Sequence, residues 1–109
     1  MFRSWLVDSR SEHGAARVRI PAVDLLDRDG ESILRAELPG VPRDAVSVRV
    51  ENRILTVEGG SSPLFRRRFR LSERIDLQRI VAEYRDGLLE VRLPLSERVR
   101  PRKITVQAA

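Results

Sequence analysis

The 109-residue sequence is 41% hydrophobic and 34% charged, carries a net charge of +5 and contains no cysteine. This length favours a single domain with a modest core, and the lack of cysteine excludes disulfides, thiol catalysis and cysteine-based metal sites. No apolar run reaches the roughly 20 residues of a membrane span, and the first ten residues lack the apolar stretch of a secretory signal. We therefore expect a cytoplasmic protein.

The first 19 residues differ from the rest of the chain and are interpreted as an N-terminal arm. Phe2, Trp5 and Leu6 are spaced like one face of a helix, and polar residues follow them. A helix this short is marginal by itself. The segment is therefore predicted to be an adaptable arm, and a frayed terminus is the alternative.

Alternation of apolar and polar residues dominates from residue 31 onward and predicts β-strands. In the first of these strands Ile33, Arg35 and Glu37 are expected to face away from the apolar side. The residues that alternate on one face of the successive strands are Leu34, Ala36 and Leu38; Val46, Val48 and Val50; Leu55 and Val57; Ile80, Ala82 and Tyr84; and Leu89, Val91 and Leu93.

The turn residues between these segments support the strand assignment. Gly40 follows a proline and suits a type II turn, and Asn52 tolerates the left-handed region in a tight link. Residues 41–46 have room for a brief helical turn, and residues 72–80 are too short for much helix. Asp86-Gly87 predicts a two-residue hairpin turn. Short strands separated by such turns are typical of an all-β sandwich.

The segment 65–71, FRRRFRL, combines aromatic residues with arginines. In a strand, one face carries Arg66, Arg68 and Arg70, and the other carries Phe65, Arg67, Phe69 and Leu71. Proteins that bind single-stranded nucleic acid also combine aromatics with basic grooves, but those aromatics must be exposed. Here both phenylalanines align with a leucine, which favours a buried face. Arg67 then shares that face and requires a carboxylate or several hydrogen bonds.

No catalytic or metal-binding constellation is present in the sequence. His13 is the only histidine, and its position in the polar arm indicates an incidental role. Asp24, Asp27 and Asp29 precede Gly30 and resemble half of a calcium loop, but the later ligands of such a loop are missing. We interpret these aspartates as part of a turn, and we expect neither enzymatic activity nor a metal or cofactor.

Four segments, in order, resemble the α-crystallin domain of small heat-shock proteins. Residues 24–59 resemble its first half, including the ELPGV run at 37–41, and FRRRFRLS resembles the Phe-x-Arg-x-Phe-x-Leu-Pro strand, with Ser72 in place of proline. The hallmark Ala-x-x-x-(Asn/Asp)-Gly-x-Leu motif is matched by Ala82, Asp86, Gly87 and Leu89. KITV resembles the C-terminal Ile-x-Ile/Val motif.

The resemblance implies an immunoglobulin-like antiparallel β-sandwich over residues 20–97, preceded by the arm at 1–19 and followed by a tail at 98–109. It implies an ATP-independent holdase chaperone of the stress response, whose partners are partly unfolded client proteins. It also implies homo-oligomers, dimers or larger. Neither a membrane nor a cofactor is expected to take part.

In the family, the tail motif docks into an apolar groove between two strands of a neighbouring subunit. The resemblance assigns Ile104 and Val106 as anchors and places the groove between Ala45–Glu51 and Arg79–Arg85. The groove residues would be Val46, Val48, Val50, Ile80, Ala82 and Tyr84. The alternative is that KITV forms the last strand of its own sheet. The resemblance also implies that the arm residues Phe2, Trp5 and Leu6 contact clients or assist assembly.

One departure concerns subunit pairing. Many relatives carry an exchanged strand in a long loop, whereas only six residues, 59–64, are available here. Such a strand is expected to be absent. A dimer would instead pair the 65–71 strands edge to edge through Phe65, Arg67 and Phe69, unless oligomerisation is weak.

Two other functions remain open at this point. One is a β-sandwich interaction module whose basic strand binds nucleic acid or another anionic partner. The other is a scaffold that only assembles with other small heat-shock proteins.

Overall fold

The computed structural model describes residues 7–9, 18–99 and 103–108. Its elements are nine strands and three short 3-10 helices within these ranges. The strands are β1 (Val7–Ser9), β2 (Val18–Arg19), β3 (Val23–Arg28), β4 (Glu31–Glu37), β5 (Val46–Glu51), β6 (Ile54–Gly60), β7 (Leu64–Arg70), β8 (Val81–Arg85) and β9 (Leu88–Pro94). The 3-10 helices are η2 (Arg43–Ala45), η3 (Leu77–Arg79) and η4 (Glu97–Val99). None of the helices in this part of the chain is long enough to cross a membrane.

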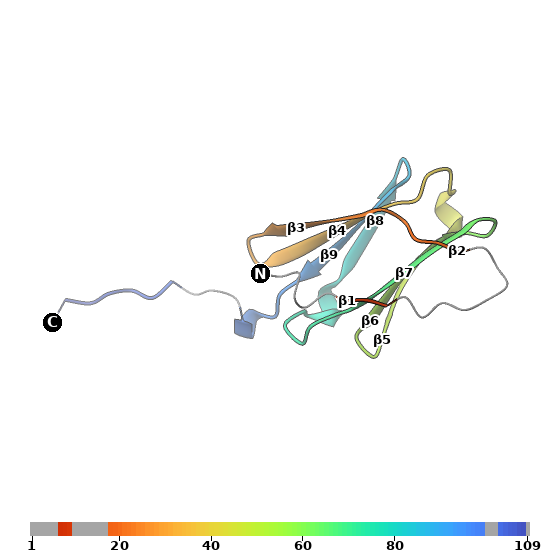
Figure 1. Cartoon of the computed structure of the whole chain (residues 1–109). Coiled ribbons are helices and arrows are strands. Elements are labelled where there is room, and N and C mark those ends of the chain that lie inside the picture. The colour runs from red at the N-terminus through yellow and green to blue at the C-terminus, as the bar shows by residue number, and fades with distance from the viewer. Residues whose placement is uncertain (1–6, 10–17, 100–102, 109) are drawn as a thin grey trace.

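The strands form two sheets that face each other in Figure 1. One sheet has the order β3-β4-β9-β8, and every neighbouring pair in it is antiparallel. The other has the order β1-β7-β6-β5, and β2 adds a short parallel pairing to β7. This arrangement confirms the predicted all-β sandwich.

The hydrophobic core lies between the two sheets and contains most of the predicted inward-facing residues. Its fully buried members are Leu34, Ala36, Leu38, Leu55, Val57, Phe69, Leu71, Ile75, Leu89, Val91 and Leu93. Burying a leucine or valine side chain contributes about 1.5–3 kcal/mol, so this layer is the main source of stability.

Ile33 lies on the predicted face of β4 but is not exposed there. The alternation along β4 placed it on the outward face with Arg35, and its side chain on that face is 0% exposed. Its partners across the sheet are Leu26 and Arg92, and it does not belong to the core cluster between the sheets. The outward face of this sheet therefore also buries an apolar residue.

The turns follow the sequence signals closely. Gly40 has a φ of 77°, and η2 occupies the expected helical turn before β5. Asn52 and Arg53 have φ values of 52° and 61° in the β5–β6 turn. The predicted hairpin joins β8 to β9 through Asp86 and Gly87, whose φ values of 51° and 79° are those of a type I′ turn.

The β6–β7 connection consists of three residues, 61–63, and contains no strand. β6 pairs directly with β7 from Ile54 and Arg70 to Gly60 and Leu64, so the two strands form a tight hairpin. Residues 59–64 therefore supply no additional strand that could be exchanged with a neighbouring subunit.

Candidate docking groove and subunit edge

β5 and β8 are the last strands of their respective sheets, and they lie on the same side of the sandwich. The opposite side is identified by Pro21, which lies two residues before β3 and accepts a hydrogen bond from Arg67 Nη1 of β7 at 3.3 Å. β3 and β7 therefore lie close together at that side. Because the sheet orders run from β3 to β8 and from β7 to β5, the strands β8 and β5 border the other side.

The β5 wall of this side carries three half-buried valines. Val46, Val48 and Val50 alternate with exposed polar residues, as the period-two pattern predicted. All three valines pack against the hydrophobic core. They therefore form an apolar strip that the core covers only partly.

The β8 wall is formed by Ile80, Ala82 and Tyr84. Ile80 and Tyr84 are half-buried and pack against the core, and Ala82 is exposed. Ile80 lies immediately before β8 rather than within it. Five of the six predicted groove residues therefore lie on the two edge strands, and Ile80 lies directly before β8. Together they border one open side of the sandwich, which we call the β5–β8 groove.

Tyr84 connects the β8 wall to the loop before β5. Its hydroxyl lies 2.6 Å from the carbonyl oxygen of Val41 and 3.0 Å from that of Leu38, and it donates its proton to these acceptors. Leu38 N–H in turn donates to the carbonyl of Gly87 at 2.8 Å. These bonds place the β8–β9 hairpin next to the start of β5, so the two groove strands are antiparallel.

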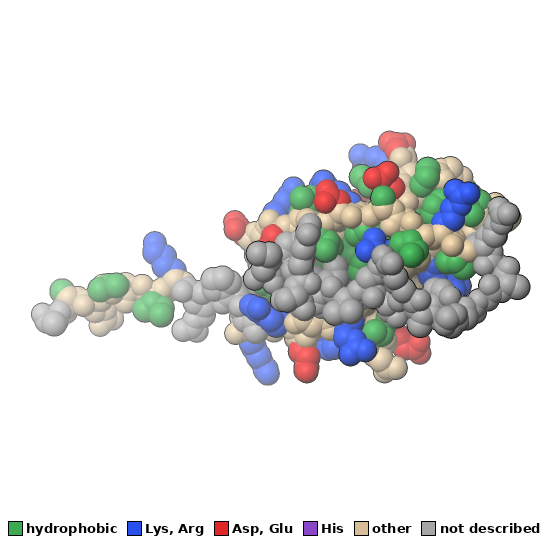
Figure 2. All heavy atoms as spheres, in the orientation of Figure 1, with side chains coloured by type: hydrophobic (Ala, Val, Ile, Leu, Met, Phe, Trp, Pro, Cys, Tyr) green, Lys and Arg blue, Asp and Glu red, His purple; other side chains and the backbone are tan. Residues whose placement is uncertain are grey.

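The described part of the tail, 103–108, forms no strand, which contradicts the alternative that KITV closes its own sheet. It lies away from the sandwich in Figure 1, and Figure 2 shows its basic and hydrophobic side chains exposed. Ile104 is 79% exposed and Val106 is 92% exposed. Both predicted anchors are thus uncovered in the single chain.

β7 carries the residues that were predicted to pair subunits. Phe69 is buried in the core, and Phe65 is half-buried and packs against it. Arg67 lies between them on the same face, with its guanidinium 5.2 Å from the Phe69 ring centre. The sequence correctly indicated that this arginine faces the apolar side, where a carbonyl oxygen and an aromatic ring are among its partners.

The outer edge of β7 is occupied by the N-terminal strands of the same chain. β1 pairs antiparallel with β7 from Val7 and Arg70 to Ser9 and Arg68, and β2 pairs in parallel with Leu64 and Phe65. The strand β1 was not predicted from the sequence. The arm residues Phe2, Trp5 and Leu6, which suggested a helical face, lie outside the described residues, as does His13.

The outward face of the β5–β6–β7 sheet is organised by Glu58. It accepts hydrogen bonds from Arg66 Nε at 2.6 Å and from Arg49 Nη1 at 2.8 Å. Burial by itself would raise the pKa of Glu58, but the hydrogen bonds and charges of the two arginines outweigh burial and lower it. Part of the basic character that this face shows in the sequence is therefore neutralised within the sheet.

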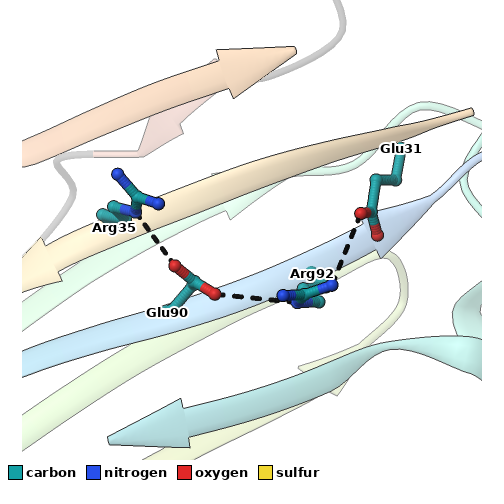
Figure 3. Close-up of polar contacts among 4 residues, drawn as sticks. All are labelled: Glu31, Arg35, Glu90 and Arg92. Carbon is teal, nitrogen blue, oxygen red and sulfur yellow. Dashed lines mark hydrogen bonds and ion pairs between the residues drawn. The ribbon is translucent and has the colours of Figure 1, made fainter. Parts of the chain in front are cut away.

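A second charge network crosses the outward face of the other sheet (Figure 3). Arg35 Nε donates to Glu90 Oε2 at 2.9 Å, and Arg92 lies 3.6 Å from both Glu90 and Glu31. These partly exposed pairs contribute little stability individually. They do engage Glu90 on both of its oxygens.

Among the described residues no group of three or more His, Asp or Glu is arranged to hold a metal ion. Asp24 and Asp27 lie on β3, and Asp29 lies in the β3–β4 turn. The three aspartates are therefore spread along a strand and its turn.

The comparisons with known proteins agree with the sandwich fold. The model of the Hsp20/alpha crystallin family matches residues 24–107. The chain belongs to this family.

Among the relatives of this small heat-shock protein, the 18 kDa antigen of Mycobacterium leprae is 34% identical, with 79% of this chain and 70% of that protein covered. Small heat shock protein C4 of Rickettsia felis is 24% identical over 86% of this chain and 68% of its own length. Among solved structures, heat shock protein 16.0 from Schizosaccharomyces pombe has a TM-score of 0.69 at 23% identity, covering 89% of this chain and 81% of its own. A small heat-shock protein from Xylella fastidiosa has a TM-score of 0.66 at 26% identity, with 81% and 96% covered. Membership of this family supports a chaperone role for the protein.

Proposed function

We propose that the protein is an ATP-independent holdase that binds partly unfolded proteins and suppresses their aggregation. The observation that supports this most directly is the β5–β8 groove, an apolar strip between two sheet edges that the single chain leaves partly uncovered. Exposed apolar surface and free strand edges are features that bind extended apolar segments of other chains. A client that exposes such segments would bind there without nucleotide.

A heated-client assay tests this proposal. A thermolabile model client is heated alone and with an equimolar amount of the protein, without ATP, and light scattering is followed. We expect the protein to lower the scattering substantially. Unchanged scattering at an equimolar ratio would reject the holdase function.

The tail is the proposed reversible cover of the groove. Ile104 and Val106 are two residues apart, so in an extended tail both point to the same side, as the groove residues do on their strands. Docking of this tail onto a neighbouring subunit would link chains into oligomers and leave the groove available to competing clients. Ile104→Ala with Val106→Ala should then shrink the oligomer, which size-exclusion chromatography with light scattering measures. An unchanged mass would contradict docking between subunits.

Pairing of subunits through Phe65, Arg67 and Phe69 of β7 remains part of the proposal. In the single chain β1 and β2 occupy that edge, so a β7–β7 dimer requires their release. Contact with clients through the arm residues Phe2, Trp5 and Leu6 is likewise proposed, and cytoplasmic location is the expected setting.

Binding of nucleic acid by the basic strand is the alternative function. Arg66, Arg68 and Arg70 share the outward face of β7. However, Glu58 of β6 pairs with Arg66 and also with Arg49 of β5. Salt-dependent binding to single-stranded oligonucleotides would favour this alternative, because phosphate contacts release counterions. Absence of binding at low salt would remove it.

A further inference from the structure

The two ends of the β5–β8 groove differ in charge. At the end formed by the β8–β9 hairpin, Glu37, Glu83 and Asp86 are exposed carboxylates, and Arg85 is the basic residue among them. The side chains of Glu83 and Asp86 form no hydrogen bond or ion pair with the described residues. Beside this end of the groove, on the outward face of β8 and β9, an open hollow of about 420 Å³ is lined by Glu83, Arg85, Asp86, Leu88 and Glu90. This end has an excess of unpaired negative charge.

Four other charged residues near the groove form two pairs of opposite sign. Arg43 and Asp44 of η2 offset each other beside the start of β5. At the far end, where β8 begins and β5 finishes, exposed Arg79 and Glu51 carry opposite charges. The excess negative charge is therefore confined to the hairpin end, where the Tyr84 hydroxyl bonds to the loop before β5.

The tail has the opposite asymmetry. The first anchor, Ile104, is preceded by four basic residues, Arg98, Arg100, Arg102 and Lys103. The residues at 107–109, after the second anchor Val106, have uncharged side chains. Lys103 is exposed and adjoins Ile104. In an extended segment its side chain points away from the side that Ile104 occupies, toward solvent and the outward-facing residues of an adjacent strand.

We propose that the tail of a second copy of this chain binds the β5–β8 groove in one direction, with Lys103 at the β8–β9 hairpin and Val106 toward Ile80. The tail then runs antiparallel to β8 and parallel to β5. In this direction the basic residues that precede Ile104 lie near Glu83 and Asp86, and the two apolar anchors face the valines of β5. The reverse direction would bring no cation of the tail to these two carboxylates and would place the basic residues of the tail next to Arg79. This inference rests on the proposed docking of the tail and adds its direction.

The direction is measured with the full chain carrying Ile104→Ala and Val106→Ala, so that its own anchors do not compete. A synthetic peptide of residues 98–109 is labelled with a nitroxide at one end or at the other, and amide NMR signals of the protein are compared. The label before Arg98 should broaden Asp86 and Gly87, and the label after Ala109 should broaden Ile80 and Val81. The reversed pattern, or equal broadening at both ends, would overturn the proposed direction while leaving docking intact.

The charge contribution is measured by fluorescence anisotropy with a peptide of the same sequence that carries a fluorescent dye in place of the nitroxide. Glu83→Gln with Asp86→Asn should weaken binding about two- to tenfold at low ionic strength, since exposed charge pairs have modest energies, and the difference should shrink near 1 M salt. Asp27→Asn on β3, at the opposite side of the sandwich, is the matched control and should leave binding unchanged. Equal affinities of the three proteins would refute the role of these carboxylates. Failure of the peptide to bind any of them would refute the docking itself, whatever the result of the heated-client assay.

Discussion

The hydroxyl of Tyr84 offers a quantitative test of how the groove is held in shape. It joins β8 to the loop before β5 through the carbonyl oxygens of Val41 and Leu38, at 2.6 and 3.0 Å. Leu38 also accepts from the N–H of Val41 at 3.2 Å, so only the Val41 carbonyl depends mainly on the hydroxyl. Tyr84→Phe removes this bond while keeping the ring that packs against the core.

The expected loss of unfolding free energy is about 1 kcal/mol. A typical intramolecular hydrogen bond contributes roughly 0.5–1.5 kcal/mol, and a fully buried carbonyl left unpaired would cost more. Here Tyr84 and Val41 are both half-buried, so water can replace part of the lost bond. For a domain of this size, the change corresponds to a fall of about 4 °C in Tm.

The assay is urea unfolding followed by far-UV circular dichroism, at one fixed protein concentration because assembly would shift the apparent stability. Ser47→Ala, which removes an exposed hydroxyl from β5, is the control and should change the unfolding free energy by less than about 0.5 kcal/mol. If Tyr84→Phe lies within the same range as this control, the hydroxyl does not hold the groove. In that case the 2.6 Å contact makes no net contribution to stability.

Three further predictions concern other parts of the fold. Because the pKa of Glu58 is lowered in the folded chain, the ionised side chain should stabilise the fold above its unfolded pKa of about 4.5, and this stabilisation should be lost as the pH falls through the folded pKa. Glu58→Gln should therefore flatten this part of a curve of Tm against pH. An unchanged slope in the variant would contradict this role of Glu58. Ser9→Cys with Arg68→Cys should form a disulfide within one chain, since these residues face each other across β1 and β7 and the protein has no other cysteine; a bridge only between chains on non-reducing gels would exclude this pairing. Gly60→Ala should lower Tm more than Gly40→Ala. Both glycines have a positive φ, but a Cβ at Gly60 would lie 2.8 Å from the Pro63 carbonyl oxygen, whereas a Cβ at Gly40 would meet open space. Equal decreases in Tm would show that the β6–β7 turn relaxes freely.

The parts of the fold that the sequence predicts best are those where periodicity and turn chemistry agree. The β8–β9 hairpin is an example, because Asp86-Gly87 accepts the positive φ values that a two-residue turn requires. The alternating valines of β5 likewise predicted their half-buried face. Both signals are local, so a single sequence contains them.

The features that the sequence did not predict depend on contacts between distant residues. Three residues of β1 carry little alternation, and what defines them as a strand is backbone hydrogen bonding to β7, which side-chain identity barely encodes. The alternation assigned Ile33 to the correct face of β4, but it did not reveal that this side chain is buried, because burial depends on packing that alternation does not report. The sequence did indicate that Arg67 needed partners, but not that a carbonyl two residues before β3 would be among them.

Two modes of assembly follow from the edges of the sandwich, and they differ in what the single chain must give up. In the single chain β7 already forms three residue pairs with β1 and two with β2. Pairing of β7 with a second subunit needs the same backbone groups, so it would replace existing hydrogen bonds rather than add new ones. Docking of a tail into the β5–β8 groove displaces no described strand, because Ile104 and Val106 are already exposed and the groove valines are only half-covered. We therefore expect the tail contact to form without rearrangement of the sandwich, whereas β7 pairing requires release of the N-terminal strands. Trapping β1 on β7 with the Ser9–Arg68 cysteine pair should thus leave tail-dependent assembly intact while preventing any dimer that uses the β7 edge.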